Sequence, residues 1–241
     1  MKKYLVVGNP IEHSLSPKLQ NYWLNFNNIK AIYGKLQAYD DDLKELCSSI
    51  RNGQLNGLNI TVPFKKKIIP HLDVLSGHAL RTQSVNTVCL KDGNVTGYNT
   101  DIDGFELSVK KLDYDISNKK IVILGAGGVV PSIIYSLKRM NVKQIYLSNR
   151  TKKNAQILKN LFEGLEIVDW GMLPDFDMII NATSLGLKEN DKFGIDFLKA
   201  GDNKLFFDVI YNPHITDFSK AGNKSRNIIE NGLNMFLFQA Q

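Results

Sequence analysis

Metal-binding and redox motifs are missing from this chain of 241 residues. It has only two cysteines, Cys47 and Cys89, which lie far apart without a CxxC spacing. This excludes the common signatures of zinc sites and thiol redox centres. The four histidines show no spacing typical of metal ligands either. We therefore expect chemistry that needs no metal.

Long apolar runs are also missing. No run approaches the roughly 18 residues that a membrane-spanning helix requires, and the apolar stretch near the N-terminus is too short for a signal peptide. Hydrophobic residues make up 43% and charged residues 22% of the chain, a balance typical of folded globular proteins rather than disordered ones. We therefore expect a cytoplasmic protein without a membrane partner.

The chain also lacks a strong net charge of one sign. The 30 Lys+Arg and 24 Asp+Glu residues give a net charge of +6, and the basic residues form only short runs such as Lys65–Lys67. A nucleic-acid-binding protein usually gathers its positive charge on one face, so we expect no nucleic-acid partner. A mild positive field suits a small anionic substrate or a phosphorylated cofactor.

Strands and helices alternate in both halves of the chain. In the second half, apolar and β-branched runs predict strands, and apolar spacing of helical period predicts helices between them, which indicates parallel βαβ units. The first hundred residues alternate similarly and include a hairpin around Asp92-Gly93. The pattern predicts two α/β layers with a boundary near 101–105. The expected strands are 4–8, 31–36, 57–62, 85–90, 94–98, 120–125, 144–148, 166–170, 178–182 and 205–211, and the expected helices are 17–26, 40–51, 128–140, 152–162 and 231–241.

A glycine-rich turn separates the predicted strand 120–125 from the next helix. Glycines at this place allow a tight turn and let a pyrophosphate approach the backbone at the helix N-terminus. The strict GxGxxG pattern fails because its sixth place is Val130, so a tight turn that binds nothing remains an alternative. Pro131 fits the first helical turn. The turn consists of Gly125, Ala126, Gly127 and Gly128.

The residues after the second strand of this half favour NADP over NAD. A free ribose 2′-OH is usually bound by Asp or Glu at that place. Here the chain reads Ser148-Asn149-Arg150-Thr151-Lys152-Lys153, without an acid and with three positive charges. A guanidinium can pair with a 2′-phosphate through two hydrogen bonds. A basic turn that is merely solvated is the alternative.

Four loops of the first half place hydroxyl and amide side chains at the ends of predicted strands. Ligands of open α/β sheets bind at the carboxyl ends of strands, and this set of side chains suits a small polyhydroxylated acid. Each loop also has a simpler explanation, because Ser or Asn can cap a helix or stabilise a turn. The loops are 8–17, 59–65, 84–87 and 97–101.

Lys65 and Asp101 are the charged residues of these loops that suit a joint role in proton transfer. Reduction of a ketone builds negative charge on its oxygen, and an ammonium group at that oxygen stabilises it and can donate the proton. A carboxylate beside the lysine can hold it and share the proton. The alternatives are a solvated lysine run for Lys65 and a helix cap for Asp101.

The order of these motifs resembles the shikimate dehydrogenase family of NADP-dependent oxidoreductases. The resemblance spans nearly the whole chain. It implies a substrate domain over 1–102, to which 224–241 returns, a Rossmann-like NADP domain over 103–223, and a cleft between them. The carrying segments are GNPIEHSLSP, NITVPFK, SVNTV, GYNTD, GAGG, NRT, NATSLG, DVIYNP and NGLNMFLFQ.

The resemblance also implies an activity and residue roles. The reaction would be the reversible reduction of 3-dehydroshikimate to shikimate in chorismate and aromatic amino-acid biosynthesis, by a monomer or homodimer. Lys65 and Asp101 would be catalytic. The implied substrate residues are Ser14, Ser16, Asn59, Thr61, Asn86, Tyr211 and Gln239. The implied NADP residues are Gly125, Ala126, Gly127, Gly128, Asn149, Arg150, Thr151, Lys153, Thr183, Ser184, Val209, Gly232 and Met235.

Three positions depart from the family pattern. Gln20 stands where relatives usually have His, Pro131 where many have Arg, and Asn234 where a second glycine is usual. Two other functions stay open. One is a quinate or shikimate dehydrogenase paralogue that uses NAD, and the other is a ligand-binding relative without catalysis. Arg150 argues against the first, and the presence of both Lys65 and Asp101 argues against the second.

Overall fold

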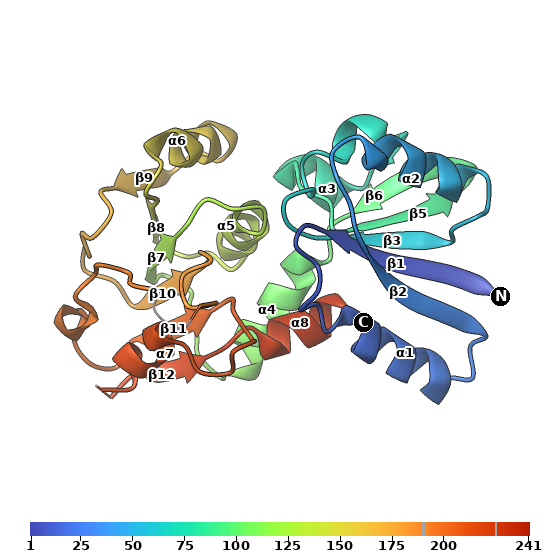
Figure 1. The fold of residues 1–241 in the computed structure, drawn as a ribbon. Helices are drawn as coiled ribbons and strands as arrows, with labels where there is room; N and C mark the ends of the chain where they lie inside the picture. Colours follow the sequence, from blue (N-terminus) through green and yellow to red (C-terminus); the bar gives the residue numbers. More distant parts are fainter. Residues whose placement is uncertain (189–190, 225) are drawn as a thin grey trace. The chain divides into compact units, whose positions relative to one another are not determined.

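The computed structural model of this chain describes residues 1–188, 191–224 and 226–241. They form two compact units, Met1–Thr100 with Ala240 and Asp101–Gln239 with Gln241. Each unit contains one six-stranded sheet (Figure 1). No helix within the described ranges is long and apolar enough to cross a membrane.

The first unit is built on a mixed sheet. Its strands are β1 (Lys2–Gly8), β2 (Ala31–Gln37), β3 (Gly57–Ile60), β4 (Val74–Leu75), β5 (Thr87–Lys91) and β6 (Asn94–Tyr98). They are arranged in the order β2-β1-β3-β5-β6-β4, with β1 parallel to β2 and β3, and β5 antiparallel to β3 and β6. Asp92 and Gly93 make the hairpin turn with φ angles of 50° and 78°, as the Asp-Gly pair predicts.

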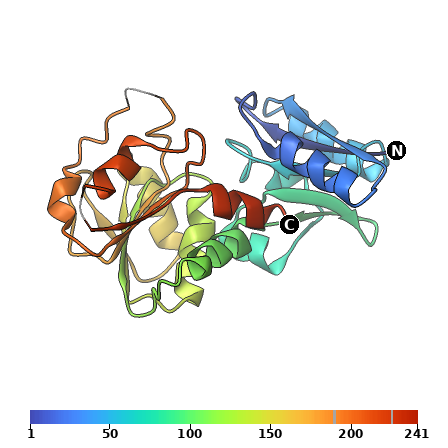
Figure 2. The same ribbon diagram turned by 90° about the horizontal axis from the view of Figure 1, so that it is seen from below.

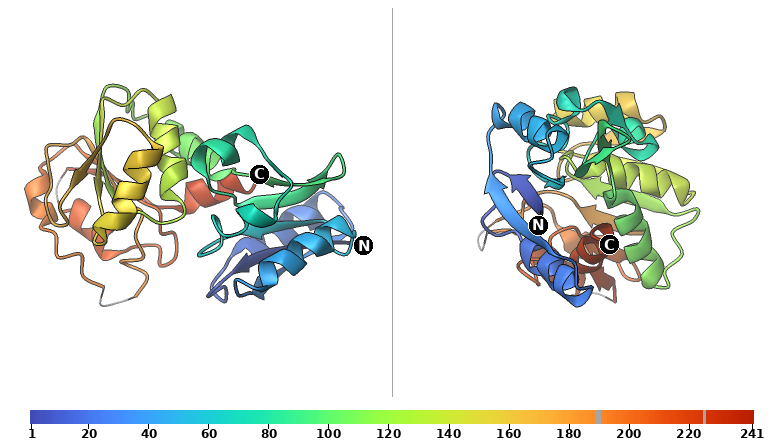
Figure 3. Two further views of the ribbon diagram at one scale, coloured as in Figure 1. Left: turned by 90° about the horizontal axis from the view of Figure 1, so that it is seen from above. Right: turned by 90° about the vertical axis from the view of Figure 1, so that its right-hand side faces the viewer.

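Helices cover both faces of this sheet (Figures 1 and 3). They are α1 (Ser16–Phe26), α2 (Asp42–Arg51), α3 (Gly77–Thr82) and the 3-10 turn η1 (Ile69–His71). Leu43 of α2 packs on the face that carries Val7, whereas Leu24 of α1 packs with Val6. Successive residues of a strand point to opposite faces, so β1 contributes buried side chains to the hydrophobic clusters on both faces of the sheet.

The two free thiols lie in this unit. Cys47 is buried on α2, and Cys89 is half-buried on β5. Burial raises the pKa of Cys47 to about 11, and burial also raises the pKa of Cys89. Both side chains are therefore thiols rather than thiolates near neutral pH.

The second unit, whose ribbon runs from green through orange to red in Figure 2, has a sheet in which every strand pairing is parallel. Its strands are β7 (Lys120–Leu124), β8 (Gln144–Ser148), β9 (Leu165–Val168), β10 (Met178–Asn181), β11 (Leu205–Asp208) and β12 (Ile228–Glu230). The order β12-β11-β10-β7-β8-β9 reverses once, between β10 and β7. This is the doubly wound order of a Rossmann-like fold, and it confirms the predicted α/β class.

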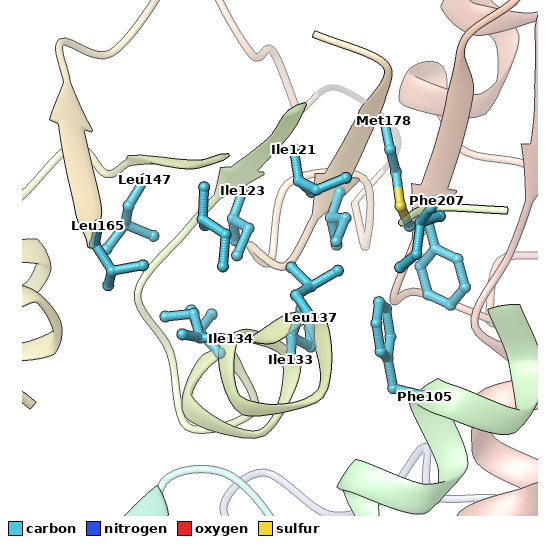
Figure 4. Close-up of a cluster of buried hydrophobic side chains, with 14 of the residues drawn as sticks. Phe105, Ile121, Ile123, Ile133, Ile134, Leu137, Leu147, Leu165, Met178 and Phe207 are labelled. Atoms are coloured by element: carbon cyan, nitrogen blue, oxygen red, sulfur yellow. The ribbon is translucent and has the colours of Figure 1, made fainter. Parts of the chain in front are cut away.

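The helices of the second unit pack against this sheet. They are α4 (Asp101–Lys111), α5 (Val130–Arg139), α6 (Lys152–Leu161), α7 (Asp217–Gly222), α8 (Leu233–Gln239) and the 3-10 turn η2 (Phe197–Ala200). Ile133 and Leu137 of α5 face Ile121 of β7, and Phe105 of α4 lies edge-on to Phe207 of β11 with ring centroids 5.1 Å apart (Figure 4). This cluster is the larger core of the unit.

Helix α4 is an element that the sequence analysis does not predict, because it treats 101–105 as a boundary. Ile102, Phe105 and Val109 are completely buried. Their spacing of three and four residues is the helical signal. The helix therefore belongs to the core of the second unit, and the boundary expected within 101–105 coincides with its first turn.

The C-terminal segment differs from the expected arrangement. We expect from the resemblance that 224–241 returns to the first domain, although residue 225 lies outside the described ranges. Instead, β12 pairs with β11, and only Ala240 groups with the first unit. The physical reason is that β12 continues the parallel sheet by hydrogen bonding beside β11, while Met235 of α8 is buried in the core of the second unit.

Helix α8 approaches α4 closely at Gly104. A Cβ added to Gly104 would lie 2.9 Å from the Met235 carbonyl oxygen and 2.9 Å from the Gln239 nitrogen. These neighbours are backbone atoms, so they cannot rotate away as a flexible side chain can. Glycine at this position permits the two helices to pack.

We predict that Gly104→Ala lowers the free energy of unfolding by about 1–3 kcal/mol, because the added methyl group overpacks a backbone contact. Gly77→Ala is the matched control, since a Cβ there meets nothing within 4 Å, and it should be neutral or slightly stabilising. Urea denaturation compares the two variants. Equal effects at both positions would contradict the proposed close packing.

Candidate active site

The loops that follow β1 and β3 lie together at the carboxyl edge of the first sheet. The backbone N–H of Asn9 donates to the Val62 carbonyl at 2.9 Å, and the backbone N–H of Thr61 donates to the Val7 carbonyl at 2.9 Å. A Cβ at Gly8 would lie 2.5 Å from the Thr61 methyl carbon. The structure therefore brings two of the four predicted polar loops to one edge.

Asn86 connects the other two predicted loops. It is 3% exposed, and its Nδ2 donates to Thr100 Oγ1 at 2.9 Å. Its Oδ1 accepts from the Thr100 amide at 3.0 Å and from Thr87 Oγ1 at 3.1 Å. The amide orientation follows from these partners, because a backbone N–H can only donate.

The side chain of Asn59 is held by the protein itself. Its Oδ1 accepts from the Tyr33 hydroxyl at 2.6 Å, and its Nδ2 donates to the Asn86 carbonyl at 3.2 Å and to Thr87 Oγ1 at 3.0 Å. Both amide hydrogens are thus used inside the first unit. Asn59 fixes the loop that carries Asn86.

Tyr33 is hydrogen-bonded to a predicted site residue and is not itself predicted by the sequence analysis. It lies on β2 and reaches across β1 to Asn59 on β3. Burial raises the pKa of Tyr33 well above its usual value, so its hydroxyl remains a proton donor. No local pattern marks this residue, because the contact depends on the order of three strands in the sheet.

Ser14 and Ser16 lie at the start of α1. The Ser16 amide donates to Ser14 Oγ at 3.3 Å. The helix is preceded by Leu15 and has no side-chain cap, with Pro17 in its first turn. The alternative that a serine caps this helix is therefore not realised. Two hydroxyl groups stand at the end of the helix that attracts anions.

Lys65 differs from the two lysines that follow it. It is 9% exposed, and its carbonyl accepts from the Val85 amide at 2.9 Å. Lys66 and Lys67 are exposed, and Lys67 pairs with Asp40 at 2.7 Å. The three residues are not one solvated run, which was the alternative for Lys65.

Asp101 is the first residue of α4 in the second unit and is 5% exposed. A carboxylate in the first turn of a helix is stabilised by the helix dipole. Because Asp101 stands inside the helix, it does not occupy the preceding cap position.

The glycine-rich turn between β7 and α5 has the predicted form. Gly125 has a φ of 111°, and a Cβ on it would lie 2.7 Å from the Ala182 carbonyl oxygen. Only glycine adopts this backbone readily. Pro131 stands in the first turn of α5, which has no side-chain cap. A turn of this form at a helix N-terminus is typical of sites that bind an anion.

The basic residues of the turn after β8 differ in whether they form an ion pair. Lys152 pairs with Asp169 at 2.6 Å. Neither Arg150 nor Lys153 forms an ion pair with any residue that the structure describes. Asn149 Nδ2 donates to the Thr151 carbonyl at 2.8 Å and shapes the turn. Arg150 and Lys153 are therefore the cations available to a phosphate.

The predicted residues of the nicotinamide side gather at the ends of β10 and β11. The Val209 amide donates to the Asn181 carbonyl at 2.9 Å, and Thr183 Oγ1 donates to Asn181 Oδ1 at 2.7 Å. Gly232 lies so close to Val209 that any Cβ would overlap the Val209 carbonyl. Ser184 follows Thr183 in the same loop. Met235 instead is buried in the core.

The other predicted residues contact neighbouring side chains and backbone groups of the chain. So do Gln20 and Asn234, two of the positions that depart from the family pattern. The Tyr211 ring stacks on Phe236 with centroids 4.6 Å apart, and Gln239 Nε2 donates to the Phe236 carbonyl at 2.9 Å. Gln20 Nε2 donates to the Ala240 carbonyl at 3.2 Å. Asn234 accepts from Lys111 Nζ at 2.9 Å and donates to Glu230 at 2.7 Å, so its side chain is committed there.

Asp208, at the end of β11, is a second group that the sequence analysis does not assign. It is completely buried. Burial raises the pKa of this carboxyl to about 6, although three hydrogen bonds to it oppose the shift. It lies within the segment DVIYNP, but the sequence alone does not distinguish it from an exposed acid at a strand end.

A mixed-sheet unit followed by a parallel sheet with a glycine-rich first turn is typical of two-domain, dinucleotide-dependent oxidoreductases. Residues 6–88 match the shikimate dehydrogenase substrate binding domain, and residues 106–211 match the family described as shikimate / quinate 5-dehydrogenase. The chain belongs to the shikimate dehydrogenase family. The resemblance stated from the sequence motifs is thereby confirmed.

Curated relatives and solved structures match along the full chain. Shikimate dehydrogenase (NADP(+)) of Pelagibacter ubique is 52% identical over 240 residues, which cover 100% of this chain and 91% of that protein. The crystal structure of shikimate dehydrogenase from Aquifex aeolicus has a TM-score of 0.93 at 34% identity, covering 100% of this chain and 90% of that one. The Thermus thermophilus enzyme in complex with NADP(H) and shikimate has a TM-score of 0.91 at 27% identity, covering 100% and 90%.

We predict that Tyr33→Phe lowers the free energy of unfolding by about 1–2 kcal/mol, because it removes the hydrogen bond that Asn59 Oδ1 accepts in a buried setting. The control is Tyr22→Phe, whose side chain is 62% exposed and which should change little. Urea denaturation of both variants tests this. If Tyr33→Phe left the free energy of unfolding unchanged, the hydroxyl would not stabilise the loop that carries Asn59.

We also predict that Asp208→Asn changes the pH dependence of stability. Between pH 3.8, the usual pKa of an Asp carboxyl, and about pH 6, the raised pKa of Asp208, the folded chain keeps this proton whereas the unfolded chain has lost it. The wild-type protein therefore loses stability as pH rises through this window, by up to about 3 kcal/mol, and Asp208→Asn should not. Urea denaturation between about pH 4 and pH 7 measures the difference. The exposed Asp217→Asn variant should follow the wild type, and parallel curves for all three proteins would contradict the prediction.

Proposed function

We propose that this chain catalyses the reversible, NADP-dependent reduction of 3-dehydroshikimate to shikimate, a step of chorismate and aromatic amino-acid biosynthesis. The observation that carries the proposal is its 52% identity, over its full length, to a protein named for this activity. The burial of Lys65 and Asp101 supports it, because burying a charged side chain costs stability and is therefore uncommon on purely structural grounds.

The first unit would bind the substrate. The hydroxyl groups of Ser14 and Ser16 at the N-terminal end of α1 suit a carboxylate, and Thr61 and Asn86 suit ring hydroxyls. Asn59 would act by holding Asn86, because both of its amide hydrogens are used inside the protein. Tyr211 and Gln239 are assigned to the substrate on the family resemblance.

Two side chains would handle the proton. When NADPH is bound, it supplies the hydride that reduces the carbonyl carbon. The Lys65 ammonium group then stabilises the developing negative charge on the carbonyl oxygen and donates a proton to it. Asp101 would be the second catalytic residue, as the family resemblance implies. In the reverse direction the same groups remove the hydroxyl proton.

The second unit would bind NADP. The positive φ of Gly125 and the uncapped start of α5 suit the pyrophosphate, with Ala126, Gly127 and Gly128 completing the turn. Arg150 and Lys153 would bind the 2′-phosphate, with Asn149 and Thr151 shaping their turn. Met235 would support the nicotinamide side through packing. The other residues of that side are Thr183, Ser184, Val209 and Gly232.

The cellular location and oligomeric state belong to the same proposal. We propose a cytoplasmic enzyme that acts as a monomer or homodimer. Its partners would be shikimate or 3-dehydroshikimate and NADP, without nucleic acid or membrane. Quinate is the alternative substrate, because one of the two matching family descriptions names quinate as well.

We predict that shikimate with NADP gives the highest rate when shikimate or quinate is combined with NADP or NAD and absorbance is followed at about 340 nm. In this assay, Lys65→Ala should lower kcat by about 10²–10⁴-fold, while NADP affinity stays within about twofold. Lys67→Ala is the control, because Lys67 is exposed and paired with Asp40. Unchanged turnover in Lys65→Ala would remove Lys65 from the mechanism.

The charge of Arg150 should decide between the two cofactors. We predict that Arg150→Ala weakens NADP binding by about tenfold or more through the lost charged hydrogen bonds and leaves NAD binding nearly unchanged. Lys152→Ala should have a smaller effect, because Lys152 is paired with Asp169. Titration with each cofactor measures this, and equal losses for NADP and NAD would show that Arg150 does not bind the 2′-phosphate.

A further inference from the structure

A buried polar network joins the ends of β10 and β11. The strands pair in parallel with Asn181 opposite Asp208, and both residues are 0% exposed. Asp208 Oδ1 accepts from Asn181 Nδ2 at 2.9 Å. Because the two strands end at the same level, the loops 182–187 and 209–216 leave the sheet beside each other.

Asn181 anchors the first of these loops. Its Oδ1 accepts from the Thr183 amide at 3.1 Å and from Thr183 Oγ1 at 2.7 Å. Its Nδ2 donates to the Leu185 carbonyl at 3.1 Å as well as to Asp208. Both amide hydrogens and both oxygen lone pairs are therefore used, which fixes the side chain and the course of the loop.

Asp208 anchors the second loop at both of its ends. Its Oδ1 accepts from the Ile210 amide at 3.0 Å, near the start of the loop. Its Oδ2 accepts from the hydroxyl of Thr216, at the end of the loop. Thr216 is 3% exposed and in turn accepts from the Ser219 amide at 3.2 Å, so it caps α7. One carboxylate therefore joins β11, the loop and the following helix.

The two loops also touch each other. Gly186 in the first loop has a φ of 107°, and a Cβ on it would lie 3.1 Å from the Thr216 Cβ. The second loop is further restrained by Gly232, whose amide donates to the Ile210 carbonyl at 3.1 Å. A substitution of Asp208 would therefore alter the positions of both loops.

A carboxylate at this position is costly for folding. No cation is among the groups that perturb Asp208, and a buried charge without an opposite charge is destabilising. An amide has the same shape and would avoid that charge. Sites that break a stabilising rule in this way are commonly functional.

We propose that Asp208 is a positioning residue for the nicotinamide end of the dinucleotide, which acts through Asn181 and Thr216 by fixing the loops 182–187 and 209–216. The inference rests on the proposed function, which assigns Thr183, Ser184 and Val209 to that end of the cofactor. Asp208 itself touches no ligand in this role. The carboxylate accepts from three donors at once, which an amide with a single acceptor oxygen cannot do.

The experiment compares two probes that differ only at the nicotinamide end. NADP contains the whole dinucleotide, whereas 2′,5′-ADP contains the adenosine half with its 2′-phosphate. Both are titrated against the intact chain by calorimetry, for the wild type and for Asp208→Asn, Thr216→Val and Thr216→Ser. Shikimate turnover is measured in parallel.

Asp208→Asn and Thr216→Val should weaken NADP by about tenfold, the effect of one strong lost interaction, and leave 2′,5′-ADP within about twofold. Their kcat should fall by about tenfold or more because the reacting ring is misplaced, with the shikimate KM changed by less than about twofold. Thr216→Ser retains the hydroxyl and should restore both properties. Asp217→Asn, an exposed change on α7, should behave as the wild type.

Two results would overturn the inference. One is wild-type NADP affinity and turnover in Asp208→Asn. The other is an equal loss of NADP and 2′,5′-ADP, which would indicate general damage to the unit. An inactive wild-type chain would contradict the proposed function instead, and in that case the ratio of the two probe affinities would still support or refute the role of Asp208.

Discussion

Parallel pairing in register is the constraint on which the predicted binding loops of each unit depend. In the first sheet, Val7 lies opposite Ile60, so the loops after β1 and β3 leave at one level and bond to each other. In the second sheet, Leu124 lies opposite Asn181, which lies opposite Asp208. Three loops of distant sequence therefore meet at one edge, and short polar side chains are long enough to join them.

The local sequence predicted those parts of the fold that local chemistry determines. The apolar run of β7 and the Gly125 turn are recognisable because a strand buried on both faces is continuously apolar and a positive φ needs glycine. Helix α4 was missed although Ile102, Phe105 and Val109 have helical spacing, since a boundary between the two layers was expected near 101–105. The return of 224–241 to the first domain was expected from family resemblance, whereas β12 follows the free edge of β11.

Other features depend on tertiary neighbours that the sequence does not reveal. Tyr33 reaches Asn59 because β1 alone separates their strands, and buried Asp208 meets Asn181 of the neighbouring strand and Thr216 eight residues further along the chain. The same holds for the cations. Within the basic segments, nearby acids occupy Lys67 and Lys152. Which members of a basic run are available to a ligand is decided by acids elsewhere in the chain.

The two thiols of the first unit have a practical consequence. A thiolate is the species that reacts with alkylating reagents and disulfides, and burial keeps Cys47 and Cys89 protonated near neutral pH. The native protein should thus form few intermolecular disulfides on exposure to air, even without a reductant. An introduced surface cysteine would then be the preferred attachment point for a maleimide dye, with both natural cysteines left in place.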